Sequence, residues 1–163
     1  MTMNLEFYTI GVYGLSSEQF FEKVLTNKID TFIDIRRRRA VRGSKYSFVN
    51  SIRLQEKLKS FDLNYIHILE LAPTNEIRLL QKVSDKNNGI IKSDRKVLVS
   101  TFKEKYTHDI LDMFDLNQLI KRLLELKSNK VVLFCVEAEA QACHRSIVAE
   151  KIEKEYSIHI THL

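Results

Sequence analysis

The chain has 163 residues, of which 44% are hydrophobic and 29% are charged. This length is typical of one domain with a sizeable core, so we expect a single domain over residues 1–163. No apolar run approaches the roughly 20 residues of a membrane span, and we expect no membrane anchor. Residues 1–7 carry no basic cluster before an apolar stretch, so we expect no signal peptide. The only two cysteines, Cys135 and Cys143, then favour reduced thiols in a cytoplasmic protein.

The net charge of +5 is a moderate basic bias. It is compatible with nucleic-acid or phosphorylated partners, and equally with a lysine-rich solvated surface. The position of the charge is more informative than its sum. Six cationic residues fall within ten positions that contain no acidic residue, and they are Arg36, Arg37, Arg38, Arg39, Arg42 and Lys45. Tyr46 and Phe48 add stacking surfaces, so this segment is either a nucleic-acid contact or a flexible solvated loop.

The first half of the chain alternates strand-like and helix-like patterns. The expected strands cover residues 5–12, 30–35 and 63–68. Ser16 with Gln19 three residues later has the spacing of a capping box, which predicts the start of a helix. Asn50 or Ser51 is expected to start a second helix, after the arginine-rich segment.

The second half is mostly helical until a buried strand appears. We expect helical segments within residues 74–128, interrupted at Asn87-Asn88-Gly89, with two helices near 97–111 and 116–126. Residues 130–136 form a continuous apolar run, which is typical of a strand buried on both faces of a parallel sheet. A helix over 143–156 and a short strand over 159–163 complete the pattern.

This order of elements predicts a three-layer α/β/α fold, Rossmann-like, with a mainly parallel sheet of about five strands. Ligands of such sheets bind beyond the carboxyl ends of the strands. The loops to search are therefore 11–14, 34–39, 67–71 and 137–145. Residues 74–128 are long and polar enough to cover that crevice.

The segment Cys143-His144-Arg145-Ser146 is expected at the start of the last helix. A helix N-terminus offers free N–H groups and partial positive charge, which suits an anion and lowers the pKa of a cysteine. The alternative is structural, with a buried Cys143 and an Arg145 that pairs with a nearby glutamate.

Two carboxylates accompany this segment. Glu137 follows the buried strand, where it could act as a general base, orient an arginine, or form a structural ion pair with Arg36 or Arg145. Asp34 and Arg36 share one side of the pleat at the end of the second strand. We expect Asp34 to be partly buried and paired with Arg36, because buried carboxylates need partners.

We assign no metal site from the sequence. The available ligands are Cys135, Cys143, His144, His67 and His162, and they form no CxxC or HxxxH pair. We place Cys135 in the core of a strand and Cys143 at a helix start, which also argues against a disulfide between them. No GxxxxGK[ST], GxGxxG or GxSxG motif occurs, so the usual phosphate-loop, dinucleotide and hydrolase motifs are absent.

Several segments together resemble the domain of unknown function 488 family. They are Tyr8-Thr9-Ile10-Gly11, Asp34-Ile35-Arg36, Tyr65-Ile66-His67, Glu70-Leu71, Phe134-Cys135-Val136-Glu137 and Cys143-His144-Arg145. The Cys-x-Glu pattern followed by Cys-His-Arg is the most specific part. The resemblance implies a compact α/β domain and carries no established activity with it.

The chain departs from the family pattern at three places. Val12 and Tyr13 stand where a histidine and a serine or threonine are usual, which removes a polar group from the crevice. Ala72 replaces a glycine after Glu-Leu, and Ala140 occupies the place of a frequent proline. These departures put any shared family chemistry in question for this member.

Three hypotheses follow, and they leave open whether the domain is an enzyme, which cofactor it uses and how it oligomerises. The first is a phosphate- or nucleic-acid-recognising domain, which could act on nucleotides or nucleic acid. Its binding residues would be Arg36, Arg37, Arg38, Arg39, Arg42, His144, Arg145 and Ser146, and its catalytic residues Cys143, Glu137 and Asp34. The second is a thiol- or metal-dependent site around Cys143, His144 and Glu137. The third is a non-catalytic interaction module whose polar cluster braces loops.

Overall fold

A computed structural model describes residues 4–163 and confirms the α/β class. All the strand pairs are parallel, and the five strands lie in the order β3-β2-β4-β1-β5. The strands are β1 (Glu6–Ile10), β2 (Thr31–Asp34), β3 (Asn64–His67), β4 (Lys130–Phe134) and β5 (Ile160–His162). The expected parallel sheet of about five strands is therefore confirmed.

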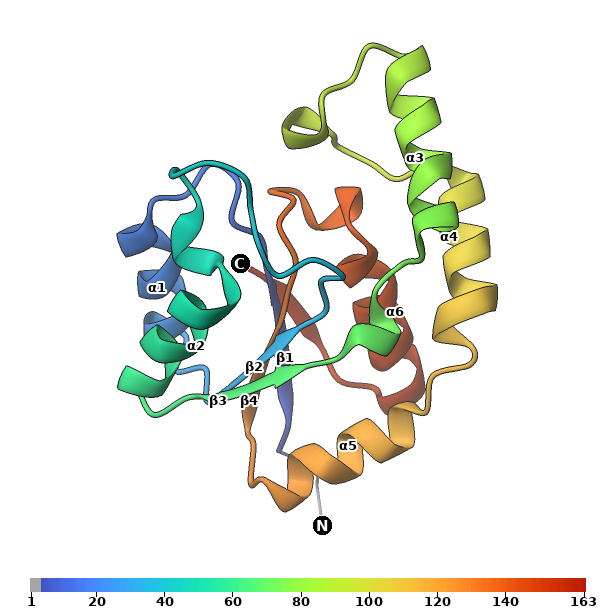
Figure 1. Ribbon diagram of the computed structural model, residues 1–163. Helices are drawn as coiled ribbons and strands as arrows, with labels where there is room; N and C mark the ends of the chain where they lie inside the picture. The colour runs from blue at the N-terminus through green and yellow to red at the C-terminus, as the bar shows by residue number, and fades with distance from the viewer. Residues whose placement is uncertain (1–3) are drawn as a thin grey trace.

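Helices cover both faces of the sheet. They are α1 (Ser17–Thr26), α2 (Ser51–Ser60), α3 (Asn75–Asn87), α4 (Ser100–Tyr106), α5 (Leu116–Glu125) and α6 (His144–Tyr156). Figure 1 shows α1 and α2 on one side of the sheet and α6 on the other, with α4 outside α6. Helix α3 projects beyond the end of the sheet at which the strands finish (Figure 1).

Strand β4 lies at the centre of the sheet, between β2 and β1. Four of its five residues are buried, from Val131 to Phe134, as the continuous apolar run predicted. The strand ends at Phe134, which is earlier than the expected end at residue 136. Cys135 therefore lies just beyond the strand, and not within it.

The helix starts follow their capping residues. Ser16 caps α1 in a full capping box: the Gln19 amide donates to Ser16 Oγ at 3.1 Å, and the Ser16 amide donates to Gln19 Oε1 at 2.9 Å. Asn50 occupies the N-cap of α2, but its side chain serves another segment. Its Oδ1 accepts from the amide of Val41 at 2.7 Å and so holds the arginine-rich loop to the helix start.

The helix expected near 97–111 is shorter and less regular than predicted. It begins only at Ser100 because Val99 has extended backbone (φ −67°, ψ 146°). The amides of Leu98 and Val99 donate to the carbonyl of Gln141 and to Gln81 Oε1. After Tyr106 the chain widens into a π-helical turn, in which the Asp112 amide donates to the carbonyl of Thr107 at 2.8 Å.

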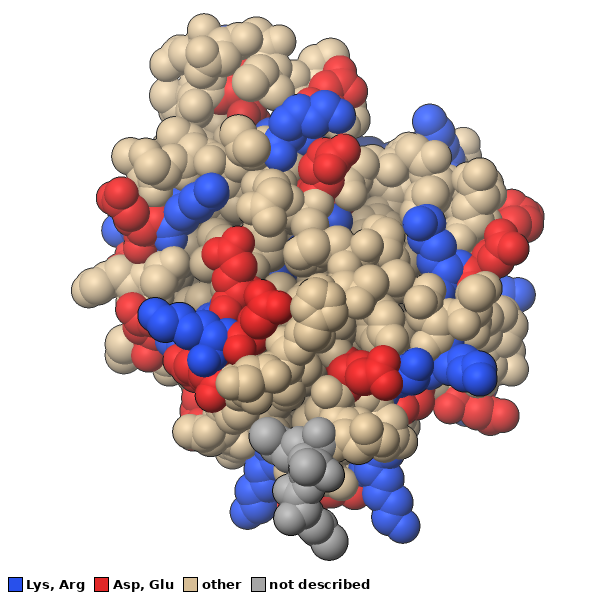
Figure 2. All heavy atoms as spheres, turned by 180° about the vertical axis from the view of Figure 1, so that it is seen from behind, with Lys and Arg blue, Asp and Glu red and all other residues tan. Residues whose placement is uncertain are grey.

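Within residues 4–163, none of the helices combines the length and the apolar character that crossing a bilayer requires. Charged side chains of both signs are interspersed on the face shown in Figure 2.

Candidate functional site

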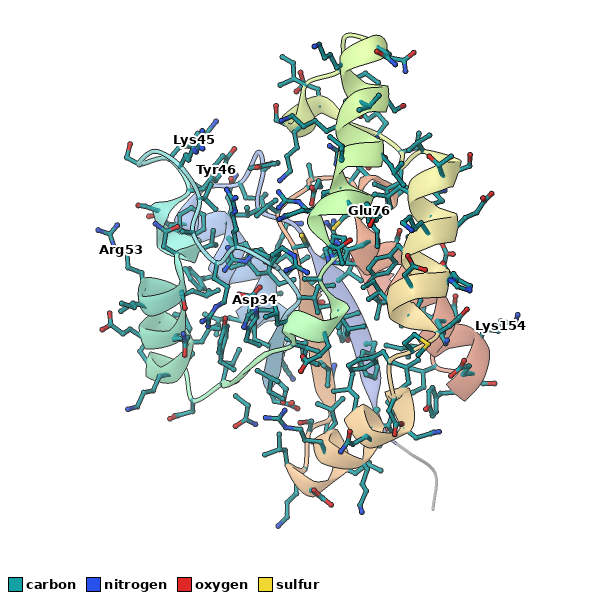
Figure 3. All side chains as sticks on the ribbon, turned by 45° about the vertical axis from the view of Figure 1, so that its right-hand side comes forward. Asp34, Lys45, Tyr46, Arg53, Glu76 and Lys154 are labelled. Atoms are coloured by element: carbon teal, nitrogen blue, oxygen red, sulfur yellow. The ribbon has the colours of Figure 1, made fainter. Side chains whose placement is uncertain are left out.

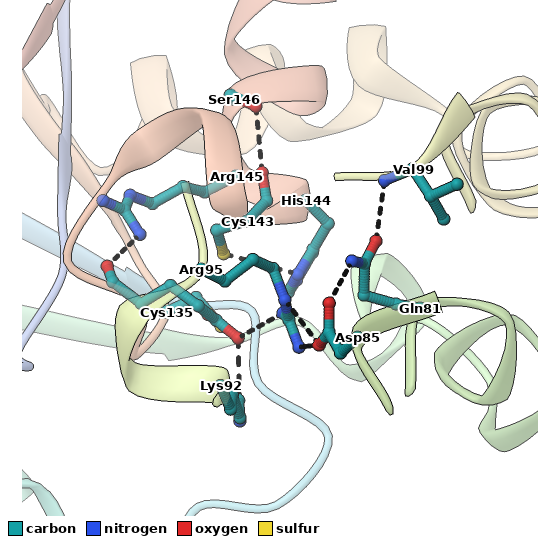
Figure 4. A network of polar contacts seen from close by, with 11 residues as sticks. Gln81, Asp85, Lys92, Arg95, Val99, Cys135, Cys143, His144, Arg145 and Ser146 are labelled. Carbon is teal, nitrogen blue, oxygen red and sulfur yellow. Dashed lines mark hydrogen bonds and ion pairs between the residues drawn. The ribbon is translucent and has the colours of Figure 1, made fainter. Parts of the chain in front are cut away.

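Two cysteines and a histidine converge where β4 ends and α6 begins. Cys135 follows β4 and donates its amide to the carbonyl of Ile10. Cys143 is the N-cap of α6, with an extended backbone (φ −138°, ψ 146°). Their sulfur atoms and a ring nitrogen of His144 all lie within 4.8 Å of one another. Figure 4 shows this cluster and the polar contacts around it.

The orientation of His144 is fixed by the backbone of the neighbouring strand connection. Its Nε2 lies 3.0 Å from the carbonyl oxygen of Ile35, which can only accept, so Nε2 carries a hydrogen. Its Nδ1 then faces the sulfur of Cys143 at 3.6 Å. The ring also packs against Tyr106, with 5.5 Å between ring centroids. The imidazole is thus held with one nitrogen turned toward the thiols.

The two thiols differ in their ionisation. Burial opposes a charge on Cys143, but the thiol of Cys135 and the positive charge of His144 outweigh it and hold the pKa of Cys143 well below its usual range. The interaction with Cys143 and burial together raise the pKa of Cys135 well above normal. Burial lowers the pKa of His144, yet the adjacent Cys143 raises it more. These opposite shifts favour ionisation of Cys143 over ionisation of Cys135.

Glu137 is buried and borders the thiols. Its Oε2 lies 3.4 Å from the Cys135 sulfur, and its Oε1 lies 3.5 Å from Arg95 Nη1 and 3.6 Å from Lys92 Nζ. Burial and the charge of Cys143 raise the pKa of Glu137, while Lys92 opposes the rise. The sequence hypothesis of an ion pair with Arg36 or Arg145 is wrong, because Lys92 and Arg95 take that role. Both partners lie more than forty positions before Glu137 in the sequence, and no local sequence motif connects them with it.

A polar network links this carboxylate to the projecting helix α3. Arg95 donates to Asp85 Oδ2 through Nε at 3.0 Å and Nη2 at 2.5 Å. Asp85 accepts from Gln81 at 2.7 Å, and Gln81 in turn accepts the amide of Val99 at 2.8 Å (Figure 4). Residues 92–99 are thereby fastened against the loop that carries Glu137.

Arg145 is almost completely buried, and its guanidinium donates hydrogen bonds to oxygen atoms of the protein. Its Nη1 donates to the carbonyl of Glu137 at 2.6 Å, and its Nη2 donates to the carbonyl of Ala138 at 3.1 Å. Its Nε donates to Thr9 Oγ1 at 3.3 Å. Gly11 lies under the same loop, where an added Cβ would stand 1.9 Å from the Glu137 carbonyl oxygen. The loop after β4 is therefore packed closely against Gly11 and is hydrogen-bonded to Arg145 of α6.

A second buried cluster is centred on Asp34. Arg36 donates to both carboxylate oxygens, from Nε at 2.9 Å and Nη2 at 2.8 Å, and also to the carbonyl of Val49. Tyr65 donates its hydroxyl to Asp34 Oδ2 at 2.8 Å, and burial together with the charge of Asp34 raises the pKa of Tyr65 to about 12. The guanidinium lies over the ring of Phe134, 4.6 Å from its centroid. The expected pairing of Asp34 with Arg36 is present, and Asp34 is fully buried.

The family model described as "Domain of unknown function DUF488" matches residues 16–152. The chain belongs to the DUF488 family. The matched range contains both clusters and extends from the cap of α1 into α6. No curated protein matches the chain.

The remaining residues singled out in this DUF488 chain lie at different depths. Ser146 is buried and donates its hydroxyl to the carbonyl of Cys143 at 2.9 Å. Arg37 donates to the carbonyl of Pro73, and Arg39 is half-buried. Arg38 and Arg42 are exposed. Figure 3 shows Lys45 on the same loop, beside Tyr46 and away from the buried Asp34.

The donor atoms of Cys135, Cys143 and His144 have the softness and spacing that suit a metal such as Zn²⁺. Sequence reasoning counted Cys135 among the available ligands but placed it in the core of the strand, and so left it out of the candidate site. Two hollows of the surface lie elsewhere, one lined by β1 and the β5 connection and one between His67 and α5. The buried cluster of Cys135, Cys143 and His144 lies apart from those hollows.

Proposed function

We propose that this DUF488 domain carries a thiol-dependent site in which Cys143 is the nucleophile. The observation that supports it is the contact of the Cys143 sulfur with His144 Nδ1 at 3.6 Å, at the N-terminus of a 13-residue helix. An adjacent imidazolium and a helix N-terminus both stabilise a thiolate, which is the reactive form of cysteine.

The neighbouring groups have complementary roles in this proposal. His144, held by the Ile35 carbonyl, positions its other nitrogen toward the sulfur and stabilises the anion. The neighbouring Cys135 thiol helps to lower the pKa of Cys143. Glu137, 3.4 Å from the Cys135 sulfur, can accept or return a proton.

Arg145 and Arg36 act as positioning residues here. Each directs its donors into protein oxygens, to the carbonyls of Glu137 and Ala138 in one case and to Asp34 in the other. Arg145 holds the loop after β4, and Arg36 holds the end of β2. The thiols lie between these two segments.

The decisive test compares the alkylation rates of the two cysteines in the metal-free reduced protein, followed by peptide mass spectrometry with iodoacetamide. Exposure alone predicts that Cys135 reacts first, because it is 7% exposed and Cys143 is 2% exposed. Thiolate character predicts the reverse order, with Cys143 at least about tenfold faster. A Cys143 that reacts no faster than Cys135 would contradict the proposal.

A matched pair of variants separates reactivity from access. Cys135→Ser keeps a hydrogen-bond donor beside Cys143 and is expected to preserve fast alkylation. Cys135→Ala removes that donor and is expected to slow it severalfold. Equal rates in the two variants would show that Cys135 contributes nothing to the thiolate.

Recognition of phosphate or nucleic acid stands as a second candidate, supported by the exposure of Arg38 and Arg42 on the loop beside Lys45. A thermal-shift screen with nucleotides and short oligonucleotides tests it. Saturation at about a hundred times Kd stabilises a protein by about 2.7 kcal/mol. The shift should disappear in the double variant Arg38→Ala and Arg42→Ala and persist in a control with Lys57→Ala and Lys59→Ala on α2.

A further inference from the structure

The two thiols are closer than their sequence positions suggested. Cys135 and Cys143 are free, and their sulfurs lie within 4.8 Å of each other. Eight positions separate them, and the intervening loop folds back through a short 3-10 turn (Ala140–Ala142). Both cysteines are unbridged, but their positions after a strand and at a helix start do not keep the sulfurs far apart.

We propose that Cys135 and Cys143 form a redox-active dithiol, which hydroperoxides oxidise to an intramolecular disulfide. This deepens the proposed function, on which it rests, because it names the class of electrophile that Cys143 attacks. Cys135 then has the role of the resolving thiol.

The reaction balances in two steps. The Cys143 thiolate attacks one oxygen of a hydroperoxide, the O–O bond breaks, and the products are Cys143 sulfenic acid and an alcohol or water, with one proton taken up. The Cys135 sulfur then attacks the Cys143 sulfur, the S–O bond breaks, and a disulfide and one water are formed. The two thiols lose two electrons in total, and the hydroperoxide gains them.

Glu137 is placed for the second step. The Cys135 thiol has a single proton, and Glu137 Oε2 lies 3.4 Å from its sulfur. As Cys135 attacks, the carboxylate accepts this proton and can pass it to the departing hydroxide. Lys92 and Arg95 sit on the other oxygen of Glu137 and keep the carboxylate directed at the thiol.

The local backbone allows the sulfurs to close. A disulfide needs the sulfurs at about 2.05 Å, so at least one side chain must turn. Cys143 has extended backbone (φ −138°, ψ 146°), so the χ1 restriction on residues inside an α-helix does not apply to it. The residues between the cysteines include Ala138, Ala140 and Ala142, which carry only a methyl group.

The test treats the reduced full-length protein with hydrogen peroxide, a probe small enough for a closed site. Intact mass is followed together with alkylation of the remaining thiols and trapping of sulfenic acid with dimedone. Wild type should lose two hydrogen atoms, lose both free thiols and regain them with dithiothreitol. Cys135→Ser should stop at a dimedone-reactive Cys143, and Cys143→Ser should stay reduced.

A further variant examines the proton acceptor. Glu137→Gln should form sulfenic acid at the wild-type rate but close the disulfide at least about tenfold more slowly, as expected for loss of a general base. Circular dichroism checks that each variant is folded. Equal closure rates in Glu137→Gln and wild type would remove Glu137 from the proposal.

The outcomes separate this inference from the proposed function. Fast alkylation of Cys143, combined with peroxide oxidation to sulfinic acid and no disulfide, keeps the proposed function and overturns the dithiol. Two thiols inert to both reagents overturn both. A stoichiometric Zn²⁺ ion in the purified protein that protects both thiols from peroxide also overturns the dithiol.

Discussion

Two buried polar clusters lie at the carboxyl edge of this sheet, and they differ in how their ionisable groups are paired. Asp34 accepts from the guanidinium of Arg36, from the Arg36 amide and from the hydroxyl of Tyr65. The thiol cluster of Cys135, Cys143 and His144 holds instead two sulfurs with opposite pKa shifts beside an imidazole. The clusters touch, because His144 bonds to the carbonyl of Ile35, between Asp34 and Arg36.

This difference distinguishes buried polar residues that stabilise the fold from those that take part in chemistry. A charge whose partners are complete is explained by the fold, since a buried carboxylate is stable only when paired. A group held in an unusual ionisation state by close neighbours is the kind that active sites collect. We therefore propose that the carboxylate of Asp34 is structural, although Arg36 Nη1 beside it is buried without a hydrogen-bond partner, and that the thiol cluster carries the chemistry.

The largest expected effect comes from removing the partner of Asp34. Arg36→Met should destabilise the protein by about 3–5 kcal/mol, because it leaves an uncompensated buried carboxylate. Urea denaturation followed by circular dichroism measures this loss. The exposed Arg38→Met is the matched control and should change stability by no more than about 0.5 kcal/mol. A loss as small for Arg36 as for Arg38 would break the comparison.

The next effect concerns the arginine that holds the loop. Arg145→Met should cost about 2–3 kcal/mol, because the buried carbonyls of Glu137 and Ala138 lose charge-assisted donors. Its unfolding midpoint in urea should fall without a change in slope. A stable variant that instead loses an oligonucleotide-dependent thermal shift would move Arg145 from bracing to binding.

A smaller effect should appear in reactivity and not in folding. His144→Gln retains a donor for the Ile35 carbonyl but removes the positive charge beside Cys143. Alkylation of Cys143 should slow about tenfold, which corresponds to about 1.4 kcal/mol. Unchanged alkylation would mean that the imidazole does not stabilise the thiolate, and the thiol cluster would then resemble the Asp34 cluster in being structural.

The smallest effect is expected at the edge of the thiol cluster. Lys92→Met removes one half-exposed partner of Glu137 while Arg95 remains, so stability should change by less than about 1 kcal/mol. Alkylation of both cysteines should accelerate severalfold if residues 92–99 limit access to them. Lys96→Met, on a more exposed pair with Glu139, provides the control and should leave both rates unchanged.

Much of the fold could be predicted because its signals are local. The capping box at Ser16 and the apolar run before Cys135 each reflect a few neighbouring residues. The site was only partly predictable, since Lys92 and Arg95 reach Glu137 across more than forty positions. Cys135 was misplaced by one physical detail: β4 ends at Phe134, so Cys135 is the first residue after the strand.

Gly11 carries a consequence for any relative of this chain. A methyl group there would stand 1.9 Å from the Glu137 carbonyl oxygen, closer than two non-bonded atoms can lie. The amides of Val12 and Tyr13 both donate to the carbonyl of Val136, so the two loops cannot separate freely. A homologue with a larger residue at this place must therefore route its second loop differently, and could not present Glu137 and Cys135 to each other in the same way.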